Sequence, residues 1–351
     1  MAAQPKTKTL NLALQGGGSH GAFTWGVLDA LLEDNRLDFE AISATSAGAM
    51  NAAALAQGKS TGGSEKAREL LESFWQEISH AGAFYNPLLQ SQNAFTKFWN
   101  LDANPAFAQM QSVYESMMAT VSPYQFNPMN INPLQAVLEK IINFDEIHAC
   151  RCTKLFIAAT NVRTGTPKIF HNEEINIDVL MASAALPFLF QAVEIEEEAY
   201  WDGGYMGNPS LWPLFYEAKT RDILIVHVNP IVREDVPKDM PAIENRLNEI
   251  TFNAALLKEL RSIEFVQRLI GEDMLKDEYK DRYKDILLHA IRTEGAVSDL
   301  PVSSKFDTDW GFLTDLRDLG RTEGQKWLKA HYKDIGNRSS VDIQDNYLRS
   351  K

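Results

Sequence analysis

Short apolar runs alternate with helical patterns along the first part of the chain. Residues 10–14 form an apolar run typical of a buried strand, and residues 22–33 repeat apolar positions with the period of a helix. Residues 39–44 predict a second strand, and the small residues from 46 to 54 predict the start of a second helix. This order of strand, helix, strand and helix is typical of an α/β fold with a parallel sheet.

The alternation continues toward the C-terminal end. A Gly62-Gly63 pair separates the second helix from a third, and Pro187 ends a short helix that precedes it. Residues from Asn337 onward are polar, so we expect a frayed tail. The periodicity predicts further helices over residues 64–78, 134–142, 179–185, 243–269 and 315–331, and further strands over residues 155–160, 222–228 and 285–291.

One long segment departs from this pattern. Residues 82–133 are rich in aromatic and methionine side chains, and their charged residues are Lys97, Asp102 and Glu115. Apolar positions within the segment repeat with helical spacing, which predicts a mostly helical insertion over the α/β core. Such a segment is either ordinary core, or a cap that lines a pocket for an acyl chain or touches a lipid interface.

Composition and charge exclude several classes of protein. The 351 residues are 45% hydrophobic and 23% charged, as in a globular protein. The net charge of −13 argues against binding to nucleic acid and against tight electrostatic adhesion to anionic lipid. No apolar run has the length of a membrane-spanning helix or of a signal-peptide core, so we expect a cytoplasmic protein with transient contact with a membrane surface at most. The two cysteines, Cys150 and Cys152, lack zinc spacing and a disulfide between them would be strained, which fits a reducing compartment.

The sharpest local signal is the sequence Ala44-Thr45-Ser46-Ala47-Gly48, which joins the second strand to the second helix. A serine at such a turn is typical of a nucleophile elbow, in which the hydroxyl is held clear of the backbone. The residues two positions before and after the serine must be small, and Ala44 and Gly48 meet that need. The alternative interpretation is that Ser46 is an ordinary helix N-cap.

A glycine loop joins the first strand to the first helix. Gly16, Gly17 and Gly18 let backbone N–H groups converge on a negative charge beside a helix N-terminus. With Gly21 they satisfy a dinucleotide-binding pattern, so a phosphate cradle competes with an oxyanion hole as the interpretation. A dinucleotide site also needs an acidic residue at the end of the second strand, where this chain has Ala44-Thr45-Ser46. The oxyanion hole is therefore the preferred interpretation.

A third signal is Asp202-Gly203-Gly204. Read alone, an aspartate before two glycines is usually a turn. An elbow, an anion-stabilising loop and a later Asp-Gly-Gly rarely coincide in this order by chance, so the combination favours a functional site over a plain turn.

Together these motifs resemble those of the patatin-like phospholipases. The resemblance covers residues 8–230 and rests on Gly16-Gly17-Gly18-Ser19-His20-Gly21, Thr45-Ser46-Ala47-Gly48-Ala49, Ser183-Ala184-Ala185-Leu186-Pro187-Phe188 and Asp202-Gly203-Gly204. It implies a three-layer α/β/α fold with a mainly parallel central sheet. It also implies a Ser–Asp dyad without histidine, in which Ser46 is the nucleophile and Asp202 the base, with an oxyanion hole at Gly16, Gly17 and Gly18 whose donors are Gly17 and Gly18. In a dry pocket desolvation raises the pKa of a carboxyl group, which lets an aspartate serve as the base.

Two positions depart from the family pattern. Family members often carry Arg or Lys in the glycine loop, where this chain has Ser19-His20, so the local positive charge is smaller or depends on pH. The elbow has Ala44 where the usual motif has glycine. We expect a catalytic core over residues 8–230, with the apolar insertion at about 82–133. An extension over residues 231–336, which resembles one in bacterial members, is expected to pack on the core, followed by a polar tail over residues 337–351.

The leading interpretation is a serine lipid acyl hydrolase, a phospholipase or lysophospholipase that releases fatty acids without a metal or another cofactor. A carboxylesterase acting on neutral glycerides or polyhydroxyalkanoate polyesters is the alternative among enzymes. A nucleotide-binding module or an inactive lipid-binding scaffold would use the same glycine loop differently. His227 and His289 lie in apolar strands, and we expect both to be core residues.

Overall fold

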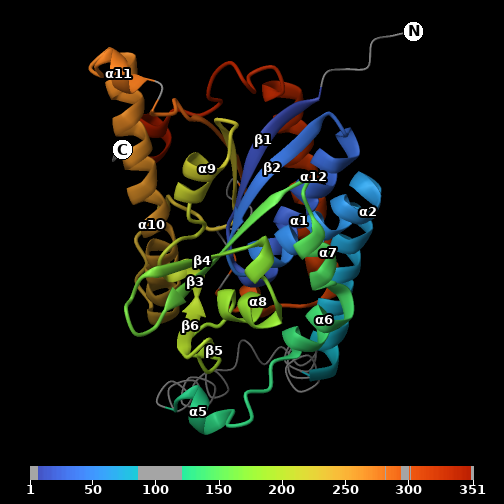
Figure 1. The fold of residues 1–351 in the computed structure, drawn as a ribbon. Coiled ribbons are helices and arrows are strands. Elements are labelled where there is room, and N and C mark those ends of the chain that lie inside the picture. Colours follow the sequence, from blue (N-terminus) through green and yellow to red (C-terminus); the bar gives the residue numbers. More distant parts are fainter. Residues whose placement is uncertain (1–6, 86–120, 281, 294–299, 301, 349–351) are drawn as a thin grey trace.

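A computed structural model describes residues 7–85, 121–280, 282–293, 300 and 302–348 (Figure 1). In these residues a central eight-stranded sheet has the strand order β5–β6–β3–β2–β1–β7–β8, and β4 also pairs with β3. The strands are β1 (Lys8–Leu14), β2 (Leu37–Ala44), β3 (Lys154–Asn161), β4 (Pro167–His171), β5 (Val193–Ile195), β6 (Glu198–Asp202), β7 (Asp222–His227) and β8 (Leu287–Arg292).

The sheet has a parallel part and an antiparallel part. β3, β2, β1, β7 and β8 run parallel to their neighbours, whereas β4, β5 and β6 form antiparallel pairs beside β3. β7 is buried along its whole length and β1 along most of it, as expected for strands covered on both faces. Because parallel strands end at the same edge of a sheet, the loops that follow β1, β2 and β7 lie close together.

Helices connect the strands and flank the sheet. The longer helices are α1 (Gly21–Asp34), α2 (Ala47–Tyr85), α6 (Pro133–Ile141), α10 (Met240–Gly271) and α12 (Trp310–His331). The shorter ones are α5 (Pro123–Phe126), α7 (Phe144–Ala149), α8 (Ile177–Ser183), α9 (Trp212–Glu217) and α11 (Asp277–Lys280). Single turns of tighter or wider helix are η1 (Gly18–His20), η3 (Asn172–Glu174), η4 (Gly203–Tyr205), η5 (Val302–Phe306) and η6 (Gln344–Leu348).

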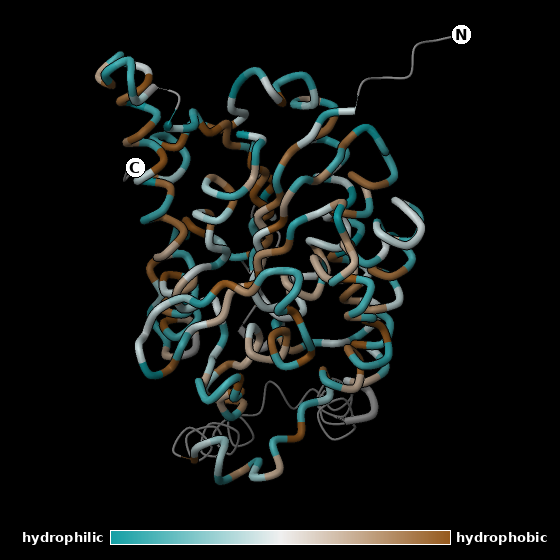
Figure 2. Tube along the Cα trace, viewed as in Figure 1, coloured by the Kyte–Doolittle hydropathy of each residue, from teal (hydrophilic) through white to brown (hydrophobic). Residues whose placement is uncertain are grey.

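Apolar side chains hold helices against both faces of the sheet. On one face Leu10, Leu12 and Leu14 belong to a buried cluster with side chains of α1, α2 and α12. On the other face Ala13 and Ile223 belong to a second cluster with side chains of α9 and α10. Figure 2 shows the apolar colour concentrated in the central strands and the polar colour in the outer loops. The predicted three-layer α/β/α fold is therefore confirmed.

The structure differs from the predicted elements mainly at the antiparallel side of the sheet. β4, β5 and β6 have five, three and five residues, which is too short for an alternating pattern to stand out in the sequence. Within α2 the backbone leaves the helical conformation at Gly62 and Gly63, so the two helices predicted there meet at a kink.

The tail from Asn337 does not fray as predicted. The N–H of Ser340 donates to the carbonyl oxygen of Leu288 in β8, at 3.0 Å. Tyr347 is buried, and its hydroxyl is 2.8 Å from Nε2 of His227. Two apolar anchors, Ile343 and Tyr347, therefore hold a segment whose overall composition is polar.

Residues after 230 also build the central layers. β8 extends the sheet beside β7, and α12 packs along α1. A Cβ added to Gly320 would collide with the carbonyl oxygen of Phe23, and one added to Gly26 would collide with that of Arg317. The two glycines therefore allow the backbones of α1 and α12 to approach each other closely.

Most of the predicted insertion, residues 86–120, lies outside the described residues. Its described end contains α5 and the loop that leads to α6. In the part of the chain that the structure describes, no helix is both long and apolar enough to cross a membrane.

Candidate active site

Ser46 occupies a sharp turn between β2 and α2. Its φ of 54° is in the left-handed region, which is unusual for a serine and typical of a nucleophile elbow. Ala44, the last residue of β2, is fully buried, and a Cβ added to Gly48 would collide with the carbonyl oxygens of Leu14 and Gln15. Both positions thus need small residues, whereas Ser46 itself is partly exposed.

Hydrogen bonds hold this turn in place. The N–H of Ser46 donates to Oγ of Ser183 at 2.9 Å, and that hydroxyl donates to the carbonyl oxygen of Ala158 at 2.7 Å. Thr45 Oγ1 donates to the carbonyl oxygen of Gly207 at 2.7 Å. Among the described residues, the Ser46 hydroxyl accepts no backbone N–H of the first helical turn, and it lies close enough to Asp202 to lower the pKa of that carboxyl group. Together with the positive φ, this excludes the N-cap interpretation.

Asp202 ends β6 and is buried beside the elbow. Its backbone pairs with Ala159 in β3, and its N–H donates to the carbonyl oxygen of Ala185 at 2.9 Å. Its side chain accepts the N–H of Gly204 at 2.7 Å, and the residue is only 1% exposed. Burial raises the pKa of Asp202 to about 7, against the opposing effects of the Gly204 N–H, the Ser46 hydroxyl and the charge of Lys305. A carboxyl group with this pKa can accept and release a proton near neutral pH.

The two glycines after Asp202 allow this close packing. A Cβ added to Gly203 would collide with the carbonyl oxygen of Ala158, and one added to Gly204 would collide with the ring of Phe252. Substitution of either glycine would therefore displace the turn that positions the Asp202 carboxylate.

The glycine loop lies directly against the elbow. A Cβ added to Gly16 would stand 2.6 Å from Cβ of Ser46. The N–H of Gly16, however, already donates to Oδ1 of Asn208 at 2.6 Å, so Gly16 supplies no free donor to the predicted oxyanion hole. In the described part of the chain, the N–H groups of Gly17 and Gly18 donate to no protein acceptor. These two groups remain available for an anion beside Ser46.

Amide side chains that the sequence analysis did not single out fix the glycine loop. Asn229 Nδ2 donates to the carbonyl oxygen of Gly16 at 2.7 Å. Oε1 of Gln15 accepts the N–H groups of Val228 and Asn229, at 2.9 and 3.0 Å. Their position in the sequence could have identified them. Each is a polar residue directly after an apolar strand, Gln15 after the first strand and Asn229 after the strand at 222–228.

The expected positive charge comes from a residue that the sequence analysis missed. His20 in the glycine loop is buried, with Nε2 2.7 Å from Oγ of Ser304, and burial lowers its pKa to about 3. It is therefore neutral at physiological pH, and the predicted pH-dependent charge in the loop is absent there. Lys305 supplies an ammonium group close enough to lower the pKa of Asp202.

His227 and His289 are core residues, as predicted. His227 is 2% exposed and hydrogen-bonded to Tyr347, and burial lowers its pKa to about 3. His289 is fully buried, with Nε2 3.0 Å from Oδ1 of Asp222. Neither histidine bonds to Ser46, so the described residues place a carboxyl group, not an imidazole, next to this serine.

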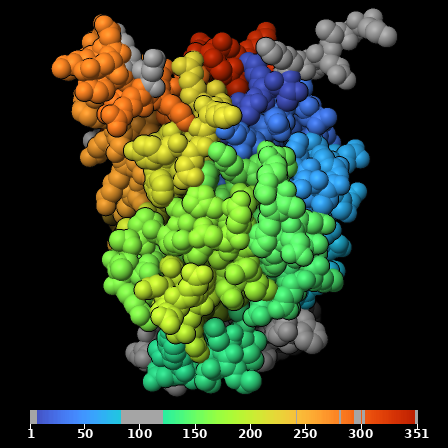
Figure 3. Space-filling model, in the orientation of Figure 1, coloured from blue at the N-terminus to red at the C-terminus, as the bar shows by residue number. Residues whose placement is uncertain are grey.

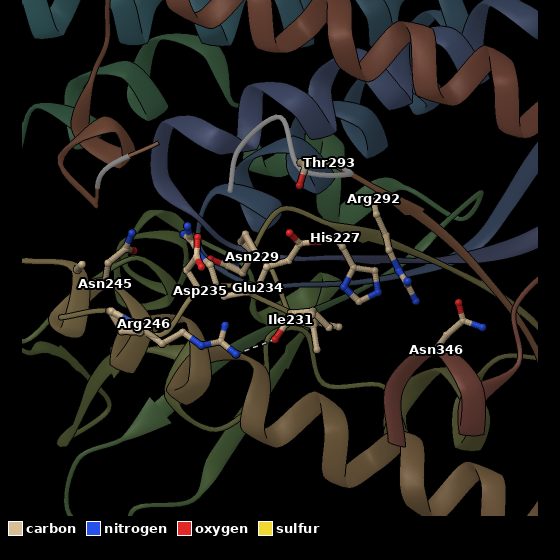
Figure 4. Close-up of a pocket in the computed structure, with 15 residues that line it drawn as sticks. His227, Asn229, Ile231, Glu234, Asp235, Asn245, Arg246, Arg292, Thr293 and Asn346 are labelled. Atoms are coloured by element: carbon tan, nitrogen blue, oxygen red, sulfur yellow. Dashed lines mark hydrogen bonds between the residues drawn. The ribbon is translucent and has the colours of Figure 1, made fainter. Parts of the chain in front are cut away.

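A cavity of about 730 Å³ lies at the ends of β7 and β8. Figure 4 shows that its walls carry His227, Asn229, Arg246 and Arg292, together with apolar residues such as Ile231. Neither Ser46 nor Asp202 lines this cavity, although Asn229 joins its wall to the glycine loop.

Comparison with known proteins agrees with this geometry. A family model described as patatin-like phospholipase matches residues 12–215, more than half of the chain, and this span contains the glycine loop, the elbow and Asp202. The chain belongs to the patatin-like phospholipase family. Membership of this family supports lipid acyl hydrolase activity in general.

Other comparisons add little to the family assignment. Among solved structures, VipD from Legionella pneumophila is similar to this chain at 13% sequence identity and a TM-score of 0.41, with 98% of this chain and 73% of that chain covered. A search of curated proteins gives no match.

Proposed function

We propose that this patatin-like protein is a serine hydrolase of lipid acyl esters, a phospholipase or lysophospholipase, with Ser46 as nucleophile and Asp202 as base. The strained turn at Ser46, whose hydroxyl lies close enough to the buried Asp202 carboxyl group to lower its pKa, is the observation that supports it most directly. A nucleotide-binding module would not need a strained serine next to a buried carboxyl group.

In the first half of the reaction, Ser46 Oγ attacks the ester carbonyl carbon while Asp202 takes the hydroxyl proton. The negative charge that develops on the carbonyl oxygen is stabilised by the N–H groups of Gly17 and Gly18, and each such donor contributes about 3 kcal/mol in comparable enzymes. Asp202 then gives its proton to the leaving alcohol, which leaves the acyl group on Ser46.

In the second half, water replaces the alcohol. Asp202 takes a proton from the water, the hydroxide oxygen attacks the acyl carbon, and the proton returns to Ser46 Oγ as the carboxylic acid leaves. One carboxylate thus serves both halves, which requires a pKa near the working pH. Burial raises the pKa of Asp202 to about 7 and supports this double role.

An exposed apolar surface beside the dyad suits the approach of lipid. We call it the apolar rim, and it consists of Tyr124, Phe126, Met129, Ile131 and Phe188. The Tyr124 hydroxyl accepts the N–H of Ala192 at 3.3 Å, and Gln191 Nε2 donates to the carbonyl oxygen of Asn127 at 2.9 Å, so the two stretches lie together. Figure 3 shows residues 121–133 at the lower end of the molecule, below the β5–β6 hairpin.

Phe188 connects the apolar rim to the segment that bonds to the backbone of the proposed catalytic residues. Phe188 lies shortly after Ser183 and Ala185. The hydroxyl of Ser183 accepts the N–H of Ser46, and the carbonyl oxygen of Ala185 accepts the N–H of Asp202. Residues 121–138 and 184–193 contain no charged side chain. The rim can therefore enter the boundary of a zwitterionic lipid surface without desolvating a charge, and we propose that it presents Ser46 to lipid.

Covalent labelling tests the proposed function. A fluorophosphonate probe should label the purified protein, and peptide mass spectrometry should place the label on Ser46. Ser46→Ala should lose the label and hydrolysis of p-nitrophenyl esters, with an unchanged circular dichroism spectrum. Labelling elsewhere, or undiminished turnover by Ser46→Ala, would contradict the assignment. Phospholipids, lysophospholipids, neutral glycerides and hydroxyalkanoate polyesters, supplied separately to the wild-type protein, identify the substrate class.

A further inference from the structure

The short turn η5 brings residues from outside the matched family region onto the glycine loop. A Cβ added to Gly18 would collide with the carbonyl oxygen of Lys305, and Oγ of Ser304 is 2.7 Å from Nε2 of His20. The family match ends at residue 215, so the family pattern accounts for neither contact. The loop that holds the free N–H groups of Gly17 and Gly18 is thus backed by the C-terminal part of the chain.

The ammonium group of Lys305 is held by neutral acceptors. Nζ donates to Oδ1 of Asn248 at 2.8 Å and to Oδ1 of Asn229 at 3.1 Å. Glu249 follows Asn248 in α10. Its carboxylate forms ion pairs with Arg233 at 2.5 Å and with Arg246 at 3.1 Å. Among the described residues no carboxylate lies within ion-pair distance of Lys305, so its charge is positioned without being neutralised.

Two residues, Asn229 and Phe252, connect Lys305 to the surroundings of Ser46 and Asp202. Asn229 accepts from Lys305 and donates to the carbonyl oxygen of Gly16, so the same amide fixes the lysine and the glycine loop. Lys305 also lies 5.9 Å from the centre of the Phe252 ring, which packs against Gly204 in the turn after Asp202. The ammonium group is therefore fixed from two sides, toward the loop and toward the Asp202 turn.

We propose that Lys305 is a positioning residue of the dyad, whose fixed positive charge keeps Asp202 ionised and favours the negative charge that develops on the glycine loop. This inference rests on the proposed serine hydrolase function. A positive charge near a buried carboxyl group favours its ionised form because the low dielectric weakens screening, and the charge of Lys305 lowers the pKa of Asp202. The C-terminal extension would then complete the active site instead of only packing on the core.

The groups that face this pair set its pH dependence. Asp202 is faced by Ser46, the Gly204 N–H, Tyr205 and Lys305, and its pKa is raised to about 7. Burial lowers the pKa of Lys305 to about 8, while Glu249 and Asp202 favour its charged form and Arg233 opposes it. His20, which also faces Lys305, is neutral. The active form has ionised Asp202 and protonated Lys305, so reactivity should rise through about pH 7 and fall above about pH 8.

The test is the pH profile of the second-order rate constant for fluorophosphonate labelling of Ser46, repeated with p-nitrophenyl butyrate as substrate. The variants are Lys305→Met, which removes the charge, and Lys305→Arg, which keeps it at all accessible pH values. Lys284→Met is the matched control, because burial also lowers the pKa of Lys284 and its Nζ bonds to the carbonyl oxygen of Ala218, away from the dyad.

We expect Lys305→Met to move the acidic limb upward by about one pH unit, with about a tenfold loss of rate below that limb. Lys305→Arg should keep the acidic limb in place and lose the decline above about pH 8, since arginine stays protonated. Lys284→Met should retain both limbs. Thermal melting of each variant shows whether it is folded.

A uniform loss of rate with unmoved limbs in Lys305→Met, or a decline near pH 8 that survives in Lys305→Arg, would overturn the inference. If Lys305→Met does not fold, the Lys305→Arg profile alone decides. Wild-type protein that neither labels at Ser46 nor turns over esters would instead refute the proposed function. Failure of the inference about Lys305 can therefore be distinguished from failure of the proposed hydrolase function.

Discussion

The dyad end of the molecule and the α9–α10 side share two features. Each has a carboxyl group with a pKa raised to about 7 by desolvation, the buried Asp202 in one region and the half-buried Glu259 in the other. Each also exposes large apolar side chains, Met129 at 81% near the dyad and Met274 at 62% after α10. The two regions differ in the groups that surround each carboxyl group.

The partners separate a catalytic arrangement from a structural one. Oε2 of Glu259 accepts the N–H groups of Leu211 and Trp212, both at 2.8 Å, and so satisfies the start of α9. Asp202 accepts one backbone N–H, and the hydroxyl of Ser46, a residue with a strained backbone, favours its ionised form. A raised pKa therefore reflects desolvation in both regions, and the neighbouring serine, the proposed nucleophile, distinguishes one region from the other.

The largest expected contrast is in catalysis. Asp202→Asn removes the base and should lower kcat/KM for p-nitrophenyl butyrate by about 10³- to 10⁴-fold, because no histidine replaces it. Glu259→Gln should keep kcat/KM within about threefold of wild type, since it touches no reacting group. Steady-state kinetics of both purified variants measure the contrast.

His227→Gln serves as the control for a hidden triad. It should retain most of the activity, because His227 bonds to Tyr347 and not to Ser46. Activity in Asp202→Asn close to that of wild type, or a folded His227→Gln as inactive as Asp202→Asn, would break the distinction between the two regions.

The second contrast concerns the exposed methionines. Met129→Asp places a charge in the apolar rim and should lower the release of fatty acid from phosphatidylcholine vesicles by about tenfold, since the carboxylate resists entry into the lipid boundary. Met274→Asp makes the same chemical change on a surface remote from the dyad and should leave vesicle hydrolysis unchanged. Fatty-acid release and vesicle co-sedimentation measure the effect.

A short water-soluble ester controls for damage to the dyad. Both methionine variants should hydrolyse p-nitrophenyl acetate at the wild-type rate, because that substrate reaches Ser46 from solution. Equal losses on vesicles for Met129→Asp and Met274→Asp would show that the apolar rim has no special role in lipid contact.

The sequence predicted the dyad region better than its surroundings for physical reasons. Ser46, Gly48, Asp202 and the glycine loop lie in local turns, whose small-residue and glycine requirements are visible in a few consecutive positions. The bond from Asn208 to Gly16 joins residues far apart in the chain, so no local pattern could show that the Gly16 N–H is occupied.

Long-range packing explains the other omissions. Lys305 follows an ordinary polar stretch, and only the fold brings it to Gly18. The pKa of His20 depends on burial by residues such as Ser304, which periodicity does not reveal. The same limit applies to the tail, where Tyr347 is held by its contact with His227 in β7.

The smallest expected contrast is in stability, and it depends on pH. The folded pKa of Glu259 is raised from 4.5 to about 7, so the folded state holds a proton that the unfolded state releases above about pH 4.5. Stability contributed by this group is therefore present at acidic pH and is lost as the pH rises to about 7. Glu259→Gln cannot ionise, and its amide oxygen can accept both N–H bonds that Oε2 now accepts. Its Tm relative to wild type should be higher at about pH 8 than at about pH 5, by about 2 °C or more.

Asp202→Asn tests the same linkage in the dyad, where the pKa of the carboxyl is raised from 3.8 to about 7. Its Tm relative to wild type should also rise between about pH 5 and pH 8, because the variant avoids a buried negative charge. The pKa of about 7 already includes the opposing charge of Lys305, so the gain should correspond to this net rise from 3.8. Differential scanning fluorimetry of the wild type and both variants at the two pH values measures these differences. A Tm difference that is the same at both pH values would show that neither carboxyl group changes its ionisation on folding, and would remove the basis for Asp202 as a proton acceptor near neutral pH.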